Sequence, residues 1–196
     1  MVPSVVRWLP AVWLVERRAG KEATVRRFLT VGFAVIAMLT VIASPAAAMR
    51  PDRFTPGPNP DLQVDDICSF PVLLHDVVNK LHVTDFFDRN GDLVRESGNG
   101  RIVEDITRLD AAGDPVRTIR RNISGPGTFT FDEDGFTLRA RGGWLFFFGP
   151  GEVSNVPGGL MWLTTGRFVW RFDGASGMWT LEQARGTRMD VCSLLA

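Results

Sequence analysis

The sequence predicts an all-β protein, an antiparallel up-and-down barrel of about eight strands, with a β-sandwich as the alternative. Three observations predict this class. Short apolar runs alternate with turn sequences from residue 70 onward, several runs alternate apolar and polar side chains, and no helical period is sustained. We favour the barrel because consecutive hairpins close naturally and closure removes exposed strand edges.

Four predicted turns share one design, an Asp that follows an apolar residue and a Gly shortly after it. Three of them begin at residues 88, 110 and 132, which is a spacing of 22 residues. Two strands in each interval would form consecutive hairpins, with this turn family at one end of the sheet. The Asp turns are residues 88–92, 110–114, 132–135 and 173–177, and the other predicted breaks are 97–100, 124–127 and 141–143.

Strand predictions rest on alternation or on the turns at each side. Residues 136–141 and 167–172 alternate cleanly, and residues 144–148 are apolar at every position, which predicts a strand covered on both faces. Residues 101–109 and 116–123 are predicted as strands because turns bracket them. Residues 70–87 fit a helix or a strand, and their β-branched content favours the strand.

Residues 1–48 are predicted to be a leader with a secretory signal peptide. Arg26 and Arg27 precede an apolar run that ends in small residues, and we expect cleavage after Ala48. A membrane anchor is the alternative, but the run has about 15 residues and a span needs about 20. Residues 1–24 fit a signal peptide poorly, so we hypothesise that translation starts at Val25.

The expected mature chain, residues 49–196, has 16 basic and 20 acidic side chains. This balance offers no basic excess for nucleic acid, and no stable membrane span is expected after cleavage. Residues 49–67 are rich in proline and are predicted to be a flexible segment before the barrel domain, residues 68–196. Cys68 and Cys192 are the only cysteines, and in a secreted or cell-envelope protein they predict a disulfide bond.

Short segments spaced through residues 68–196 resemble uncharacterised small secreted proteins that are widespread in actinobacteria. The resemblance implies an exported location and a β-rich fold, and it carries over no catalytic residue. It also favours a strand over residues 72–80. The segments that carry the resemblance are residues 68–72, 77–80, 121–126, 146–150, 163–167 and 192–196.

Few residues support a metal site or common catalysis. His75 and His82 are seven residues apart, so on one strand they would face opposite sides. Residues 88–92 resemble the start of a calcium loop, but Leu93 stands where the loop needs glycine, and a hairpin turn is the better interpretation.

The sequence also offers little support for common catalytic sites. The acidic neighbours Glu104 and Asp105 would point to opposite faces of a strand. Motifs for nucleotide binding, a nucleophilic serine or a zinc protease are missing, so we predict no cofactor and no metal.

The aromatic side chains of the C-terminal half give the functional hypothesis. Core packing is the simplest role for them. We predict that some of them line a barrel interior, and that this non-catalytic protein binds an apolar small molecule or an envelope component there. The alternatives are a small-barrel enzyme of the cyclase or isomerase type, by analogy with calycin-like and allene-oxide-cyclase-like barrels, and a structural envelope protein. The predicted ligand-binding residues are Trp144, Phe146, Phe168 and Trp170.

Overall fold

The computed structural model describes residues 50–156 and 158–196, and within them it is almost entirely β-structure. The predicted leader and the proposed start at Val25 lie outside the described residues. One antiparallel sheet contains all nine described strands, and a short helix ends the chain. No helix among the described residues has the length and hydropathy needed to cross a membrane. The elements are β1 (Asp52–Phe54), β2 (Leu62–Val64), β3 (Val72–Phe87), β4 (Leu93–Leu109), β5 (Pro115–Asn122), β6 (Gly127–Asp132), β7 (Gly135–Phe148), β8 (Leu160–Asp173), β9 (Met178–Asp190) and α1 (Val191–Leu195).

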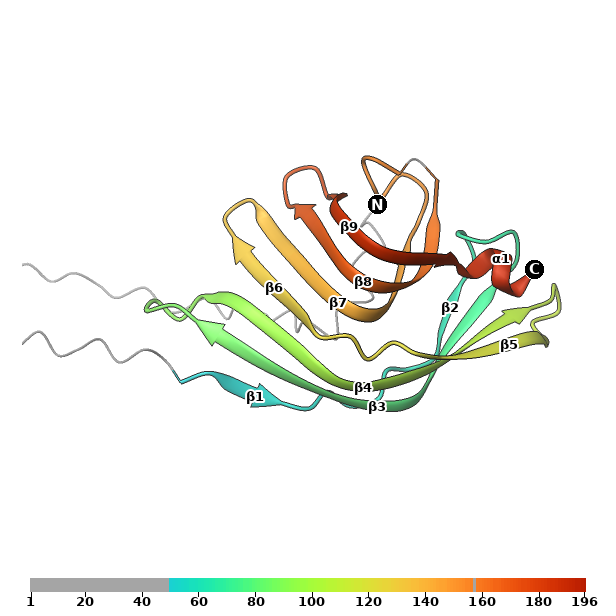
Figure 1. Ribbon diagram of the computed structural model, residues 1–196, viewed down its shortest axis with the longest axis horizontal. Coiled ribbons are helices and arrows are strands. Elements are labelled where there is room, and N and C mark those ends of the chain that lie inside the picture. Colours follow the sequence, from blue (N-terminus) through green and yellow to red (C-terminus); the bar gives the residue numbers. More distant parts are fainter. Residues whose placement is uncertain (1–49, 157) are drawn as a thin grey trace, which may run out of the picture.

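The sheet is organised around the long hairpin of β3 and β4. The strand order is β1-β3-β4-β6-β7-β8-β9, and β2 and β5 pair with β3 and β4 respectively, outside this path. Because β3 and β4 have 16 and 17 residues, each pairs with two short strands, one near each of its ends. In Figure 1, β3 and β4 form a lower layer and β6 to β9 curve above it.

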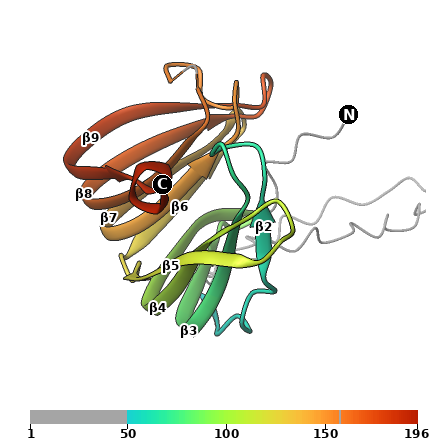
Figure 2. The same ribbon diagram turned by 90° about the vertical axis from the view of Figure 1, so that its right-hand side faces the viewer.

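The predicted all-β antiparallel class is confirmed, with nine strands where about eight were expected. Seen from its end, the sheet follows an arc from β3 through β4, β6, β7 and β8 to β9 (Figure 2). Among the described strands, β9 pairs only with β8, so no ladder closes the arc. The described sheet is therefore rolled and not closed by hydrogen bonds, and its topology does not choose between the barrel and the sandwich.

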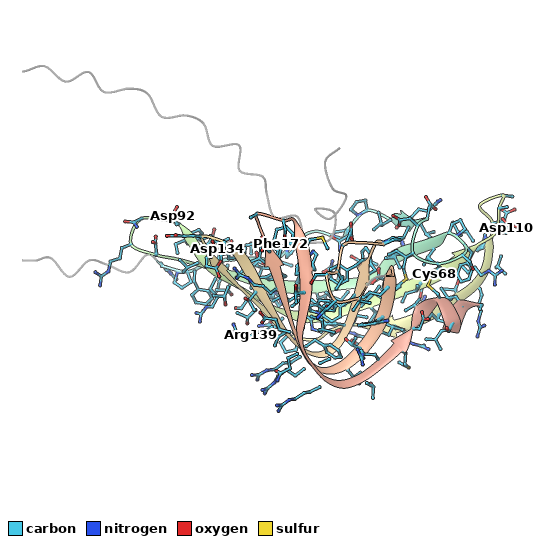
Figure 3. The ribbon with its side chains drawn as sticks, turned by 90° about the horizontal axis from the view of Figure 1, so that it is seen from above. Cys68, Asp92, Asp110, Asp134, Arg139 and Phe172 are labelled. Atoms are coloured by element: carbon cyan, nitrogen blue, oxygen red, sulfur yellow. A yellow bond between two sulfur atoms is a disulfide. The ribbon has the colours of Figure 1, made fainter. Side chains whose placement is uncertain are left out.

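All four Asp turns form as predicted, but they do not share one end of the sheet. Asp88 Oδ1 accepts from the backbone N–H groups of Asn90 and Asp92 at 2.8 and 2.9 Å, and Asp110 accepts in the same way in its own turn. The turns at Asp92 and Asp110 lie at opposite ends of the molecule (Figure 3). The predicted break at residues 97–100 is wrong, because these residues lie inside β4 and the chain runs 17 residues before it turns.

The predicted break at residues 141–143 is also wrong, because these residues lie inside β7 and Gly142 belongs to a crease in the sheet. Gly142 lies opposite Gly166, which lies opposite Gly186, so one glycine from each of β7, β8 and β9 forms a row. Their φ angles are 78°, 130° and 141°, values that side-chain-bearing residues rarely adopt. We infer that this row lets three long strands bend together over the lower layer.

Residues 72–87 form one strand, β3, so the strand interpretation of residues 70–87 is confirmed. A register shift between Asp76 and Val78 inserts one extra residue into β3. Such a bulge moves the following side chains to the other face of the sheet. His75 and His82 are consequently both exposed on the same outer face, whereas simple alternation predicted opposite faces.

Residues 50–67, expected to be flexible, contain two paired strands. β1 pairs with β3 through residues 83–85, and β2 pairs with β3 through residues 72–74. Val64 of β2 is buried in one of the two hydrophobic clusters formed by the described residues. The folded unit therefore includes this segment, and its two short strands pair along parts of the edge of β3.

Two clusters of buried side chains hold the rolled sheet together. The larger cluster contains Phe168 and Trp170, and the smaller one joins the start of β3 to β8 and α1. Phe146 packs in the first cluster and Leu145 beside the second, so the predicted two-sided cover of residues 144–148 is confirmed. The predicted disulfide bond is also present: Cys68, before β3, is bonded to Cys192 in α1, with their Cα atoms 5.4 Å apart.

Candidate binding cavity

A cavity of about 540 Å³ lies between the β3–β4 layer and the strands that curve above it. Strands β2, β3 and β4 supply one part of its wall, and β6 and β7 supply another. Connecting segments and β9 complete the lining, with Pro56 and Asn59 before β2, residues 65–67 after it, Ile123 and Gly125 before β6, Gly149 and Glu152 after β7, and Trp179 of β9. The cavity thus draws on strands from both ends of the sequence.

Aromatic side chains form the apolar wall. The rings of Trp144 and Phe146 stack with their centroids 5.6 Å apart and their planes 10° apart. Phe148 contacts Trp179, with ring centroids at 5.3 Å. Phe129 of β6 adds a further ring to this wall. The wall is large, apolar and rich in ring faces, which suits a small molecule with an extensive hydrocarbon part.

The structure places the four predicted ligand-binding residues in one aromatic cluster but divides them by role. Trp144 and Phe146 line the cavity. Phe168 and Trp170 are outside its lining and are 1% and 0% exposed, packed behind Phe146 at centroid distances of 6.0 and 5.4 Å. Phe168 and Trp170 therefore support the wall from the core, and only the other two face the space.

Glycines make room for the indole ring of Trp144 in the cavity wall. Gly98 of β4 lies opposite Gly127 of β6, and both line the cavity with Gly125. A β-carbon at Gly125 or Gly127 would collide with the indole ring of Trp144. The indole N–H donates to the backbone oxygen of Arg141 at 3.2 Å, which fixes the ring over these glycines.

Two buried glutamates of β4 form the polar part of the wall. Glu96 is 6% exposed and Glu104 is 2% exposed, and both line the cavity. They are eight residues apart on one strand and so face the same side. Glu96 lies directly opposite Asp85 of β3, and Glu104 lies directly opposite Asp76. The β3–β4 hairpin therefore contains two cross-strand pairs of acidic residues.

Glu104 has surroundings that oppose its ionisation. Its Oε1 atom is buried and has no hydrogen-bond partner among the described residues. Burial first, and then the nearby charge of Asp76, raise the pKa of Glu104 from 4.5 to about 8. Asp76 is well supplied with hydrogen bonds, because its Oδ2 accepts from Asn59 N, Asn59 Nδ2 and Asn79 Nδ2 at 3.2, 2.9 and 2.8 Å.

The surroundings of Glu96 and Asp85 also oppose ionisation. Burial and then the charge of Asp85 raise the pKa of Glu96 to about 7. The pKa of Asp85 is itself raised, by burial and then by Asp52 of β1. Asp85 Oδ1 is a further buried oxygen without a partner among the described residues. Near neutral pH the hairpin therefore holds protons on carboxyl groups that would be ionised in water.

Charge is segregated between the cavity and the outer face of the sheet. Among the described residues that line the cavity, none is Lys, Arg or His. Arg141, Arg167 and Arg185 lie opposite one another on β7, β8 and β9, and all three are exposed. The acidic residues that line the cavity are Asp65, Asp66, Asp76, Glu96, Glu104 and Glu152.

The acidic pairs were missed from the sequence because only neighbours such as Glu104 and Asp105 were compared. Asp105 points away from the cavity and forms an ion pair with Arg120 at 2.7 Å. The turn at residues 88–92 was correctly predicted, and a hairpin centred on it sets Asp85 against Glu96. The sequence signal for these acidic pairs is therefore their position on the two strands at matching distances from the predicted turn.

The remaining candidates lie away from the cavity. His75 Nδ1 is 2.6 Å from Asp61 Oδ1, and this hydrogen bond raises the pKa of the exposed histidine. Asp88 directs its carboxylate to the backbone of its own turn, as the turn interpretation requires. No group of three His, Cys, Asp or Glu residues in the described part of the chain is arranged to hold a metal ion.

Comparisons with protein-family models, with curated proteins and with solved structures found no match to this chain. The function is accordingly argued from the geometry of the cavity.

Proposed function

We propose that this protein is an exported, non-catalytic binding protein that holds an apolar small molecule in the cavity lined by Trp144 and Phe146. The single observation that carries the proposal is the cavity itself, about 540 Å³ with an aromatic wall and a few buried polar groups. Small-molecule sites are typically about 300–1,000 Å³, mostly apolar, with few orienting polar groups.

The lining of the cavity favours an apolar occupant. The cavity is partly open to solvent, so water can fill it when no ligand is bound. Its aromatic wall favours replacement of that water by a ligand with apolar surface.

The exported location is part of the proposal. The Cys68–Cys192 disulfide supports it, because such bonds form and persist mainly outside the cytosol. We infer secretion to the exterior or to the cell envelope, where an apolar molecule needs protection from water.

A small-barrel enzyme is the second candidate, and the Asp76–Glu104 pair favours it. Two carboxyl groups opposite one another, with the pKa of Glu104 raised, could serve as general base and general acid for an isomerase or cyclase reaction. Binding and catalysis would use the same cavity, so turnover of a bound ligand distinguishes the two.

Binding of the neutral dye Nile red tests the proposed function. Ile102 lines the cavity from β4, and the variant Ile102→Trp would fill part of the space. We expect the folded wild-type protein to bind the dye and Ile102→Trp to bind it about tenfold more weakly or worse. The control is Val116→Trp, which places the same ring on an exposed position of β5. Absence of dye binding, or equal binding by wild type and Ile102→Trp, would refute the proposal.

A further inference from the structure

We propose that the natural ligand is an apolar amine, whose protonated nitrogen lies at Glu104 and Asp76 while its hydrocarbon part lies against the aromatic wall. This inference rests on the proposed binding function and names the chemical class of the ligand. It is drawn from an unpartnered buried oxygen, from the sign of the charges around the cavity, and from the rings beside them.

The first observation is the unpartnered oxygen of Glu104. The side chain is 2% exposed, lines the cavity, and its Oε1 has no hydrogen-bond partner among the described residues. Buried polar atoms nearly always have a partner, and one left without a partner costs about 1–3 kcal/mol. A ligand that brings an N–H donor into the cavity would remove this cost.

The second observation is the sign of the surrounding charge. Six acidic residues line the cavity from the segment after β2, from β3, from β4 and from the β7–β8 connection, and none of the described lining residues is basic. A carboxylate or phosphate ligand would be repelled by this wall, and an ammonium group would be attracted. Asp76 lies directly opposite Glu104, so a cation there would face two carboxyl groups.

The third observation is the aromatic wall beside these acids. Trp144, Trp179 and Phe129 line the same cavity as Glu104. Ring faces attract ammonium groups through their quadrupole, and the attraction strengthens when water is excluded. An apolar amine would use the rings for its hydrocarbon part and the carboxyl groups for its nitrogen.

Proton exchange gives this ligand class a distinctive signature. In the empty cavity, burial and Asp76 keep Glu104 protonated at pH 7, because they raise its pKa to about 8. An alkylammonium group keeps its proton until about pH 10. Binding at pH 7 should therefore expel close to one proton from Glu104. The other charged groups that face the cavity are Asp65, Asp66, Asp76, Glu96 and Glu152.

The experiment compares three ligands that share one chain length. Decylamine, 1-decanol and decanoate are used to displace Nile red from the wild-type protein at pH 7 and pH 8.5. We expect decylamine to compete about tenfold more strongly than 1-decanol, decanoate to compete least, and the preference for the amine to grow at the higher pH. Competition by 1-decanol that equals or exceeds that of decylamine would overturn the inference.

The variant Glu104→Gln removes the carboxyl group and keeps the shape of the side chain. We expect it to lose about tenfold in its preference for decylamine over 1-decanol, measured as the ratio of their competition against Nile red on the same variant. The control is Glu133→Gln, an exposed acid in the β6–β7 turn, which should keep that preference. An unchanged preference in Glu104→Gln would overturn the inference.

Calorimetry of wild type in two buffers of different ionisation enthalpy gives a second readout that needs no variant. We expect close to one proton to be released per decylamine bound at pH 7, and no release with 1-decanol. Amine binding without proton release would contradict the role of Glu104. Failure of Nile red itself to bind would instead refute the binding function, so the two failures are distinguishable.

Discussion

Glu104 is a residue whose behaviour follows from its position in the β3–β4 hairpin. Its carboxyl group is buried and lies opposite Asp76, and both features raise its pKa, so the folded protein holds a proton there near neutral pH. In the unfolded chain the same group is ionised above its ordinary pKa of 4.5. The folded state therefore binds more protons between about pH 5 and pH 8, and stability must fall as pH rises through this window.

The variant Glu104→Gln tests this linkage. Each such carboxyl contributes a slope of up to about 1.4 kcal/mol per pH unit. Wild type should lose stability from pH 5 to pH 8, partly through Glu96 and His75, whose raised pKa values act in the same direction. Glu104→Gln should show a smaller slope and be about 1–3 kcal/mol more stable at pH 8. Denaturant unfolding across this range, with Glu133→Gln as control, measures the effect. A slope equal to that of wild type would contradict the raised pKa.

The sequence predicted the aromatic residues of the cavity wall but not its buried acidic residues, and the difference has one physical reason. Trp144 and Phe146 were predicted because aromatic residues gather in the C-terminal half. Glu96 and Glu104 were missed because their burial depends on the strand facing them. An isolated glutamate in a strand is usually solvated, and only its cross-strand neighbours and cover show otherwise.

Whole strands were easier to predict than their ends. The Asp turns mark hairpins reliably because each Asp satisfies the backbone of its own turn. Glycine is ambiguous, because it marks a turn or a bend inside a long strand. Residues 97–100 and 141–143 belong to the second kind, so the predicted breaks divided β4 and β7 wrongly.

The glycine crease predicts that a side chain added at Gly166, where β8 pairs with β9, lowers the stability of the protein. A β-carbon at Gly166 would collide with the backbone oxygen of Arg185, and its φ of 130° is unfavourable for alanine. We expect Gly166→Ala to lose about 3 kcal/mol or more, because the conformational cost and the collision add. Gly113→Ala is the matched control: its φ is 90°, but no atom lies near the added carbon, so a loss of about 1 kcal/mol is expected. Equal losses in urea unfolding would show that the crease tolerates a side chain.

At the scale of the whole molecule, the cavity depends on register more than on composition. The irregularities in β3 and β4, at Val77 and Val94, set which side chains of the hairpin face inward. A shift of one residue would turn Glu96 and Glu104 outward, and no local pattern in the sequence fixes the position of a bulge. The sequence could therefore predict a β-rich, disulfide-bonded protein, while the acidic, aromatic cavity emerged only from the paired strands.

The disulfide bond links two parts of the fold that lie far apart in the sequence. It joins the segment between β2 and β3 to α1, over a sequence separation of 124 residues. A cross-link over so long a loop lowers the entropy of the unfolded chain, with a stabilising effect of up to about 5 kcal/mol in the chain-entropy model. The bond also holds the segment that carries Asp65, Asp66 and Ile67 on the cavity wall.

The double variant C68A/C192A should therefore change both stability and binding. We expect it to lose about 2–5 kcal/mol in urea unfolding, and to bind Nile red more weakly even where it remains folded, because the tether on residues 65–67 is gone. Oxidised and reduced wild type, compared under the same conditions, provide the matched control, since no other cysteine is present. If stability fell and dye affinity did not, the bond would act on the unfolded chain alone. A loss below about 1 kcal/mol would instead mean that the two hydrophobic clusters hold the rolled sheet without it.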